Sequence, residues 1–137
     1  MDESARLLAS IPMLGKASLP WVLAYLRDGK RFASGRAAAG YAGLTPMLIQ
    51  SGDRSDKPHI SRMGPADLRK ALYMPAMVYS YGKCRESVYL PFVQRLEANG
   101  KAKKAIIVAL MRKVLTIAQA LLASGKPFDP AMLGGSC

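Results

Sequence analysis

The chain has 137 residues, of which 50% are hydrophobic, and its 20 Lys and Arg against 9 Asp and Glu give a formal net charge of +11. This length supports one domain with a real core, and the apolar content excludes a disordered chain. The strong positive charge favours a polyanionic partner, either nucleic acid or an anionic membrane.

A membrane is the poorer of these two partners. No run approaches the roughly 18 uninterrupted apolar residues that a spanning helix needs, and the opening residues "MDESARLLAS" lack the plan of a signal peptide. The sequence therefore predicts a cytoplasmic protein without a membrane partner. Its two cysteines, Cys84 and Cys137, are too few for a disulfide framework, and a single histidine provides no spaced zinc ligands. Two free thiols are expected.

Helical signals dominate the first third of the chain. A short helix is expected to end before a turn at residues 12–15, and a second helix tolerates Pro20 in its first turn and stops at Asp28-Gly29. A third helix is predicted over residues 34–43, with Ser34 as its N-cap. The "LTP" that follows breaks the helical pattern.

Helical spacing resumes after a polar segment. Residues 64–81 predict a helix that Pro75 kinks or breaks, and residues 86–98 predict another. The clearest element is residues 101–125, where apolar residues recur at i, i+3, i+4 and i+7. A polar outer face is predicted to carry Lys101, Lys104, Arg112 and Gln119.

Together these patterns predict an all-α fold, a compact helical domain over residues 1–128 followed by a loosely held tail at residues 129–137. No strand alternation of useful length is present. The predicted core comprises Trp21, Leu23, Leu26, Leu68, Leu72, Val78, Leu110, Val114 and Leu121.

The polar segment "QSGDRSDKPHIS", residues 50–61, interrupts the helices and contains three serines and the single histidine. The acidic residues of the chain are scattered, which does not favour a two-metal site, and neither a P-loop nor a Ser-His-Asp order is present. A lone loop histidine such as His59 is usually solvated. Residue chemistry alone therefore does not predict an independent enzyme.

Basic residues follow Ser51 closely. Their guanidinium forks, together with free N–H groups at the start of the helix near Pro65, could hold a backbone phosphate. Gly52 would let the Ser51 hydroxyl approach phosphorus, although an ordinary loop serine is the alternative that composition favours. These residues indicate a basic helical module that binds nucleic acid. The candidate nucleic-acid-binding residues are Arg54, Lys57, Arg62, Arg69 and Lys70.

An ordered series of motifs covers almost the whole chain. It resembles the C-terminal domain of insertion-sequence transposases of the Piv/MooV type, the insertion sequence one-ten family. One such match would be weak, but a complete series in order is specific. The series runs from a helix-hairpin-helix-like "LLASIPMLGKAS" through "YAGLTP", a Ser-Gly pair, "ISRMG" and "LRKALYMPA" to the closing "MRK" helix.

The resemblance implies a recombinase chemistry. In this family an N-terminal RuvC-like domain carries a DEDD set of magnesium-binding acids, and the C-terminal domain supplies a serine that forms a phosphoserine linkage with DNA. Ser51, rather than Ser55 or Ser61, matches that serine, and Arg54 and Arg62 match basic positions expected to bind phosphate. No cofactor is expected in this chain, because the magnesium would belong to the RuvC-like domain.

The same resemblance implies partners. These are DNA, a guide (bridge) RNA as used by some members, a RuvC-like domain or full-length transposase, and further copies in a homo-oligomer. The RuvC-like half is not part of this sequence, so a truncated gene product, a decayed copy and an excised domain all stay open. A non-catalytic nucleic-acid-binding remnant is the alternative function, and a basic structural RNA-binding protein is a third.

Two positions depart from the family pattern. Met13-Leu14-Gly15 stands where many relatives have Gly-Ile-Gly, so a phosphate-binding hairpin there would lose close backbone approach. Pro58 stands where relatives often place glycine.

Overall fold

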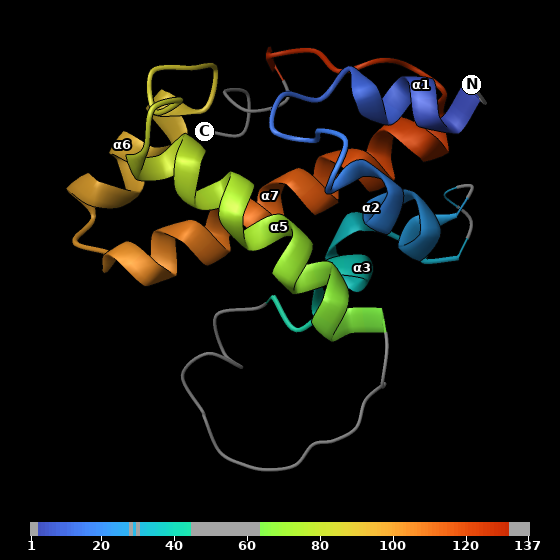
Figure 1. Cartoon of the computed structure of the whole chain (residues 1–137), viewed down its shortest axis with the longest axis horizontal. Coiled ribbons are helices and arrows are strands. Elements are labelled where there is room, and N and C mark those ends of the chain that lie inside the picture. The colour runs from blue at the N-terminus through green and yellow to red at the C-terminus, as the bar shows by residue number, and fades with distance from the viewer. Residues whose placement is uncertain (1–2, 28, 30, 45–63, 132–137) are drawn as a thin grey trace, which may run out of the picture.

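The structure, a computed structural model, describes residues 3–27, 29, 31–44 and 64–131 (Figure 1). Within these residues every regular element is a helix, which confirms the predicted all-α class. The helices are α1 (Glu3–Ala9), α2 (Leu19–Leu26), α3 (Gly35–Tyr41), α5 (Gly64–Tyr81), α6 (Leu90–Ala98) and α7 (Lys103–Ser124).

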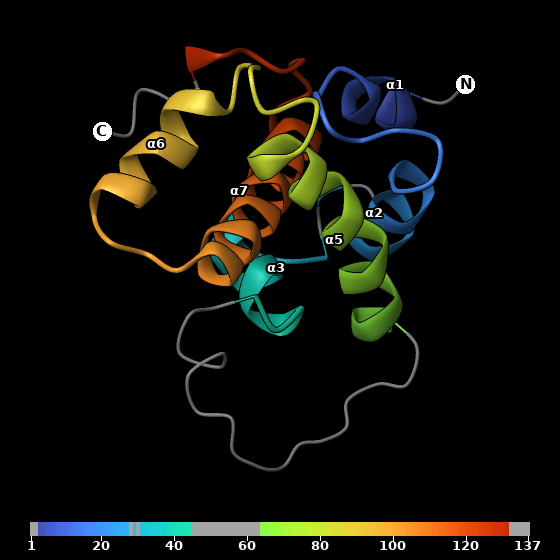
Figure 2. The same ribbon diagram turned by 60° about the vertical axis from the view of Figure 1, so that its left-hand side comes forward.

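Helix α7 is the centre of the fold and packs against each of the other five helices. Figures 1 and 2 show that α5 crosses α7 on one side, that α3 packs against α7, and that α6 lies beside the N-terminal half of α7. By length and mean hydropathy (1.9) it is apolar enough to cross a membrane, yet 61% of that stretch is buried inside the fold. A core helix of a soluble protein passes the same test, so the apolar character of α7 is explained by packing.

The predicted core is largely confirmed. Leu23 and Val78 are half-buried rather than buried. The prediction that Trp21 lies in the core is wrong, because its side chain is 44% exposed. Helix α2 buries Val22, and its next turn adds Tyr25 and Leu26 at the i+3 and i+4 spacing, which leaves Trp21 on a neighbouring face. The confirmed core positions are Leu26, Leu68, Leu72, Leu110, Val114 and Leu121.

Gln119 corrects the predicted outer face of α7. It is only 3% exposed, and its amide Nε2 donates to the carbonyls of Gly29 (2.8 Å) and Phe32 (3.2 Å). The helix buries Leu115, Ala118 and Leu122 around it, so this half of α7 has no polar face toward solvent. Gln119 instead ties the α2–α3 connection to the core.

Local signals predicted several helix boundaries well. Ser34 caps α3 as expected, since its side chain accepts a hydrogen bond from the N–H of Ala37 at 3.1 Å. Helix α5 has the predicted bounds and runs through Pro75 as one element, so the alternative of a break there is wrong. Helix α6 begins at Leu90, later than the predicted residue 86, with Pro91 in its first turn.

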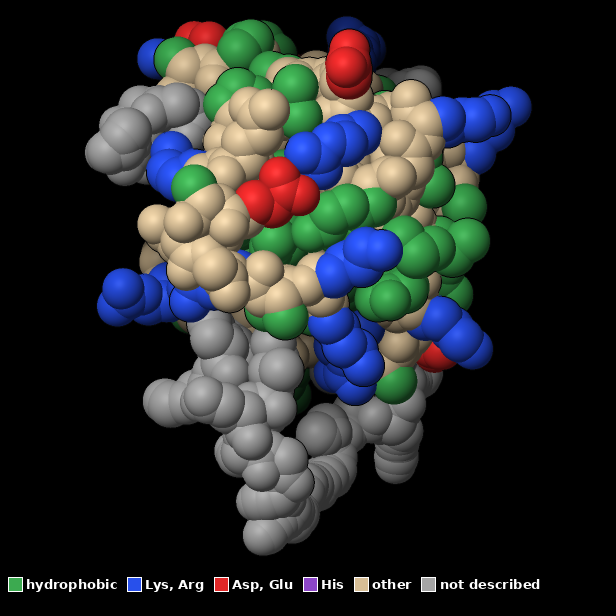
Figure 3. Space-filling model, turned by 90° about the vertical axis from the view of Figure 1, so that its left-hand side faces the viewer, with side chains coloured by type: hydrophobic (Ala, Val, Ile, Leu, Met, Phe, Trp, Pro, Cys, Tyr) green, Lys and Arg blue, Asp and Glu red, His purple; other side chains and the backbone are tan. Residues whose placement is uncertain are grey.

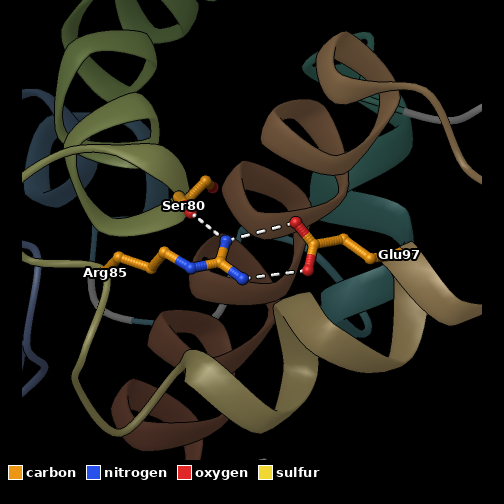
Figure 4. Close-up of polar contacts among 3 residues, drawn as sticks. All are labelled: Ser80, Arg85 and Glu97. Carbon is orange, nitrogen blue, oxygen red and sulfur yellow. Dashed lines mark hydrogen bonds and ion pairs between the residues drawn. The ribbon is translucent and has the colours of Figure 1, made fainter.

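A bidentate ion pair joins the α5–α6 connection to the end of α6 (Figure 4). Arg85 donates from Nη2 to Oε1 of Glu97 (2.9 Å) and from Nη1 to Oε2 (3.2 Å), and Nη1 also donates to the Ser80 carbonyl (2.9 Å). The hydrogen bond from Arg85 lowers the pKa of Glu97. These contacts hold α6 beside the C-terminal end of α5.

One residue of the turn between α1 and α2, Met13, has a glycine-like backbone conformation. Met13 has φ of 94°, in the left-handed region that disfavours side chains, and is buried at 6% exposure. The Tyr89 hydroxyl donates to the neighbouring Pro12 carbonyl at 2.6 Å, which ties the turn to the start of α6. The Met13 side chain is therefore packed in the core although its backbone has a conformation that favours glycine.

Candidate nucleic-acid interface

A groove of about 570 Å³ opens where the end of α3, the first turns of α5 and the start of α7 meet. We call it the α5–α7 groove. Leu44, Tyr73 and Val108 contribute apolar walls, and three of the described lining residues have cationic side chains. Those cations are Arg69, Lys70 and Lys104.

The α5–α7 groove is lined by residues from both sides of the polar segment, close to where the described residues end at 44 and begin again at 64. Leu44 and Ala66 both line it, and between them lies the polar segment that contains Ser51. The predicted site residues of that segment lie outside the described residues, while their two flanks converge on the groove. Those residues are Ser51, Arg54, Lys57 and Arg62.

Arg69 and Lys70 were both predicted to bind nucleic acid, and the structure places both in the α5–α7 groove. Arg69 is half-buried and its Nη1 donates to the carbonyl of Ala42 at 2.9 Å, just beyond the end of α3. A Cβ added to Gly43, whose φ is +78°, would lie 3.1 Å from that nitrogen. Arg69 thus joins α3 to α5, whereas the side chain of Lys70 is exposed.

Lysines crowd the start of α7. Lys101, Lys103 and Lys104 are exposed, and the first turn of α7 contains no acidic residue. Cations at a helix N-terminus oppose the helix dipole, so this arrangement adds to the positive potential of the helix end. Figure 3 shows Lys and Arg side chains gathered on this side of the molecule, with few acidic ones between them. Such a surface attracts the phosphates of a nucleic acid.

The sequence did not predict that α5 and α7 line one groove. Lys104 was placed on an outer face of its helix, but nothing in its spacing related it to Lys70 or to the polar segment. Tyr73 was not singled out, although it follows Lys70 by three residues and therefore shares its helix face. The sequence signal that could have identified this surface is the i, i+3 pair of a cation and an aromatic residue, Lys70 and Tyr73.

The described residues do not fit a metal site. Among them, no group of three or more His, Cys, Asp or Glu side chains could hold an ion. Asp67 is the acidic side chain among the described residues that line the α5–α7 groove.

The fold and the site together define a basic helical domain with a groove that attracts polyanions. Residues 5–89 match the Transposase IS116/IS110/IS902 family, and the chain belongs to that family.

The chain is also similar to curated proteins. It is 45% identical over 130 residues to the pilin gene-inverting protein of Moraxella bovis and 46% identical over 130 residues to that of Moraxella lacunata. Each alignment covers 94% of this chain and 40% of the relative. The transposase for insertion sequence element IS1328 of Yersinia enterocolitica is 28% identical over 138 residues, which cover 93% of this chain and 38% of that protein. The chain thus spans about 40% of the length of its Moraxella relatives.

Proposed function

We propose that this domain binds the DNA backbone and supplies the serine nucleophile of a DNA transposase or site-specific recombinase. The observation that carries the proposal is the α5–α7 groove in a chain of this family, because the flanks of the Ser51 segment meet beside its lysines. The names of the relatives describe pilin gene inversion and transposition for those proteins. We extend DNA strand exchange to the longer protein in which this domain works.

The proposed reaction is a transesterification. The Ser51 Oγ attacks phosphorus, a serine–phosphate ester forms, the bond from phosphorus to one deoxyribose oxygen breaks, and the released hydroxyl takes up the proton. The ester conserves the bond energy, so rejoining needs no ATP. Arg54 and Arg62 counter the negative charge that develops on the oxygens around phosphorus, while Lys70 and Lys104 hold flanking phosphates. No step is assigned to a metal in this chain.

The proposal includes the remaining partners. The domain would work in the cytoplasm with a RuvC-like domain or a full-length transposase that supplies magnesium, in a homo-oligomer, and with a guide RNA where the subgroup uses one. The turn between α1 and α2 would serve as a helix-hairpin-helix-like contact to the backbone. The φ of 94° at Met13 supports this role, because it is a left-handed backbone conformation of the kind that glycine adopts readily.

Salt dependence tests the DNA-binding half of the proposal. If about five phosphates are neutralised, the log–log slope of affinity against salt on duplex DNA should be about −4 to −5. Lys104→Glu should flatten this slope, whereas Lys126→Glu, the same change in an exposed residue beyond the far end of α7, should alter it less. Binding that ignores salt, or equal effects of the two variants, would contradict the groove as the binding surface.

Trapping tests the nucleophile. The domain joined to a matching RuvC-like half, with guide RNA if required, should form a covalent adduct on a suicide DNA substrate. The adduct should map to Ser51 by mass spectrometry and disappear in Ser51→Ala, while Ser55→Ala and Ser61→Ala should retain it. An adduct that persists in Ser51→Ala would overturn the assignment. Failure of every joined form to react, with DNA binding intact, would favour the non-catalytic alternative.

A further inference from the structure

A second groove, of about 560 Å³, lies between α6 and the outer face of α7. We call it the α6–α7 groove. It shares Leu44 and Val108 with the α5–α7 groove, so the two are neighbours on the same side of the molecule. Figure 3 shows this side, where hydrophobic side chains gather among Lys and Arg.

Small side chains on α7 create the space. Ala105 and Ala109 line the groove one turn apart on the same face of the helix, and Thr116 continues that face toward its C-terminal half. Helix α6 contributes Phe92 and Leu96 as the opposite wall. The result is an apolar slot between two helices, of a size within the roughly 300–1,000 Å³ of small-molecule sites.

The described residues that line the α6–α7 groove combine an aromatic ring with cations and include no acidic side chain. Phe92 lies near one lining cation, Lys113, whose Nζ is 5.8 Å from the centroid of its ring, and near Arg95 of α6, which does not line the groove and whose Cζ is 5.7 Å from that centroid. Arg112 also lines the groove, and its buried Nε has no hydrogen-bond partner among the described residues. Lys101 adds an exposed charge at the rim. A ligand with a flat apolar surface and an adjoining negative charge complements this arrangement.

We propose that the α6–α7 groove takes one unpaired nucleotide of the DNA strand whose backbone runs through the α5–α7 groove. The base would stack against Phe92, as bases stack on aromatic side chains in single-strand-binding proteins, and Lys101 and Arg112 would meet its phosphate. The shared wall at Leu44 and Val108 makes the two sites consecutive along one strand. This inference rests on the proposed DNA-binding function and adds a recognition site for an unstacked base.

Two single strands of equal charge test the proposal. The first is an oligothymidylate of about eight nucleotides, and the second is an abasic strand of the same length, whose phosphates are retained. The intact chain should bind the thymidylate strand about tenfold more tightly than the abasic strand. Phe92→Leu, which keeps an apolar side chain but removes the ring, should abolish most of this preference. Its affinity for the abasic strand should stay within about twofold, since phosphate contacts are unchanged.

Matched variants control for folding and charge. Phe128→Leu makes the same change at a half-buried phenylalanine outside both grooves and should keep the tenfold preference. Lys101→Glu should weaken binding of both strands and leave their ratio unchanged.

The outcomes separate this inference from the function on which it rests. Equal, salt-dependent binding of both strands by the intact chain would overturn the nucleotide site and leave DNA binding in place. A preference that survives in Phe92→Leu would also overturn it. Binding of neither strand, nor of duplex DNA, would overturn the proposed function as well. Tighter binding of an oligouridylate than of the thymidylate strand would overturn the assignment to DNA.

Discussion

The guanidinium of Arg69 donates a 2.9 Å hydrogen bond to the carbonyl of Ala42, across an interval of 27 residues. This bond fastens the end of α3 to the first turns of α5, and the polar segment with Ser51 lies between the two residues in the chain. A residue predicted to bind phosphate therefore also holds together the base of the proposed catalytic segment.

Arg69 and Lys70 should respond differently to the same substitution. Arg69→Ala should lower the free energy of unfolding by about 1–2 kcal/mol, because it leaves the Ala42 carbonyl without its charged donor. Lys70→Ala removes one charge from an exposed side chain and should stay within about 0.5 kcal/mol of the parent. Urea denaturation of both variants measures the difference. Equal stabilities would show that the Arg69 bond contributes nothing to the fold.

Gly29 and Gly125 form a matched pair for backbone strain. Both have positive φ (85° and 78°), but a Cβ at Gly29 would lie 2.8 Å from Leu122 Cβ, whereas at Gly125 nothing lies within 4 Å. Gly125→Ala should cost about 1–2 kcal/mol from the left-handed conformation alone. Gly29→Ala should cost a further 1–3 kcal/mol, roughly, because α7 must move. Thermal melting of the two variants tests this order, and a smaller loss at Gly29 would contradict the close packing of the α2–α3 connection on α7.

Gln119 should be sensitive to loss of its amide. Gln119→Met leaves the carbonyls of Gly29 and Phe32 without their donor, at a cost of about 1–2 kcal/mol. The loss is moderated because Oε1 of Gln119 is itself buried without a partner among the described residues. The exposed neighbour gives the control, since Ala120→Met should change the free energy of unfolding by about 0.5 kcal/mol or less. Similar effects at both positions would contradict the buried amide.

Because of the Arg85–Glu97 ion pair, the stability of the fold should depend on pH in a predictable direction. Because the hydrogen bond from Arg85 lowers the pKa of Glu97, the pair stabilises the fold above the unfolded pKa of about 4.3. That contribution is lost as the pH falls through the lowered pKa of the folded state. An NMR titration should place the Glu97 carboxyl below its ordinary range in the parent and return it upward in Arg85→Gln. Arg95→Gln, on the same helix as Glu97, is the control and should leave the Glu97 pKa unchanged.

The core assignments can be tested by size reduction. Leu110→Ala should destabilise by about 2–5 kcal/mol, because the side chain is fully buried on the central helix. Trp21→Ala removes a larger side chain but should cost only about 1 kcal/mol, since the indole is 44% exposed. Denaturation curves of the two variants decide between the sequence-based core and the observed one. A larger loss at Trp21 would restore it to the core.

Local chemistry determined much of the helical framework. The bounds of α5, the N-cap at Ser34 and the apolar spacing of α7 could all be predicted, because hydrophobic period and cap residues act within a few residues of the chain. The family resemblance could likewise be read from ordered motifs, and residues 5–89 match that family. These features depend on neighbours in sequence.

Only the tertiary structure decided which helix faces are covered. Glutamine is usually a surface residue, yet Gln119 is buried because α7 is surrounded by the other helices. Trp21 is exposed because neighbouring residues of α2 fill the core instead. Lys70 and Lys104 line one groove although they belong to α5 and α7, and the slot beside Phe92 depends on how α6 packs against α7. Periodicity defines the faces of each helix, but packing between helices determines which faces join into a site.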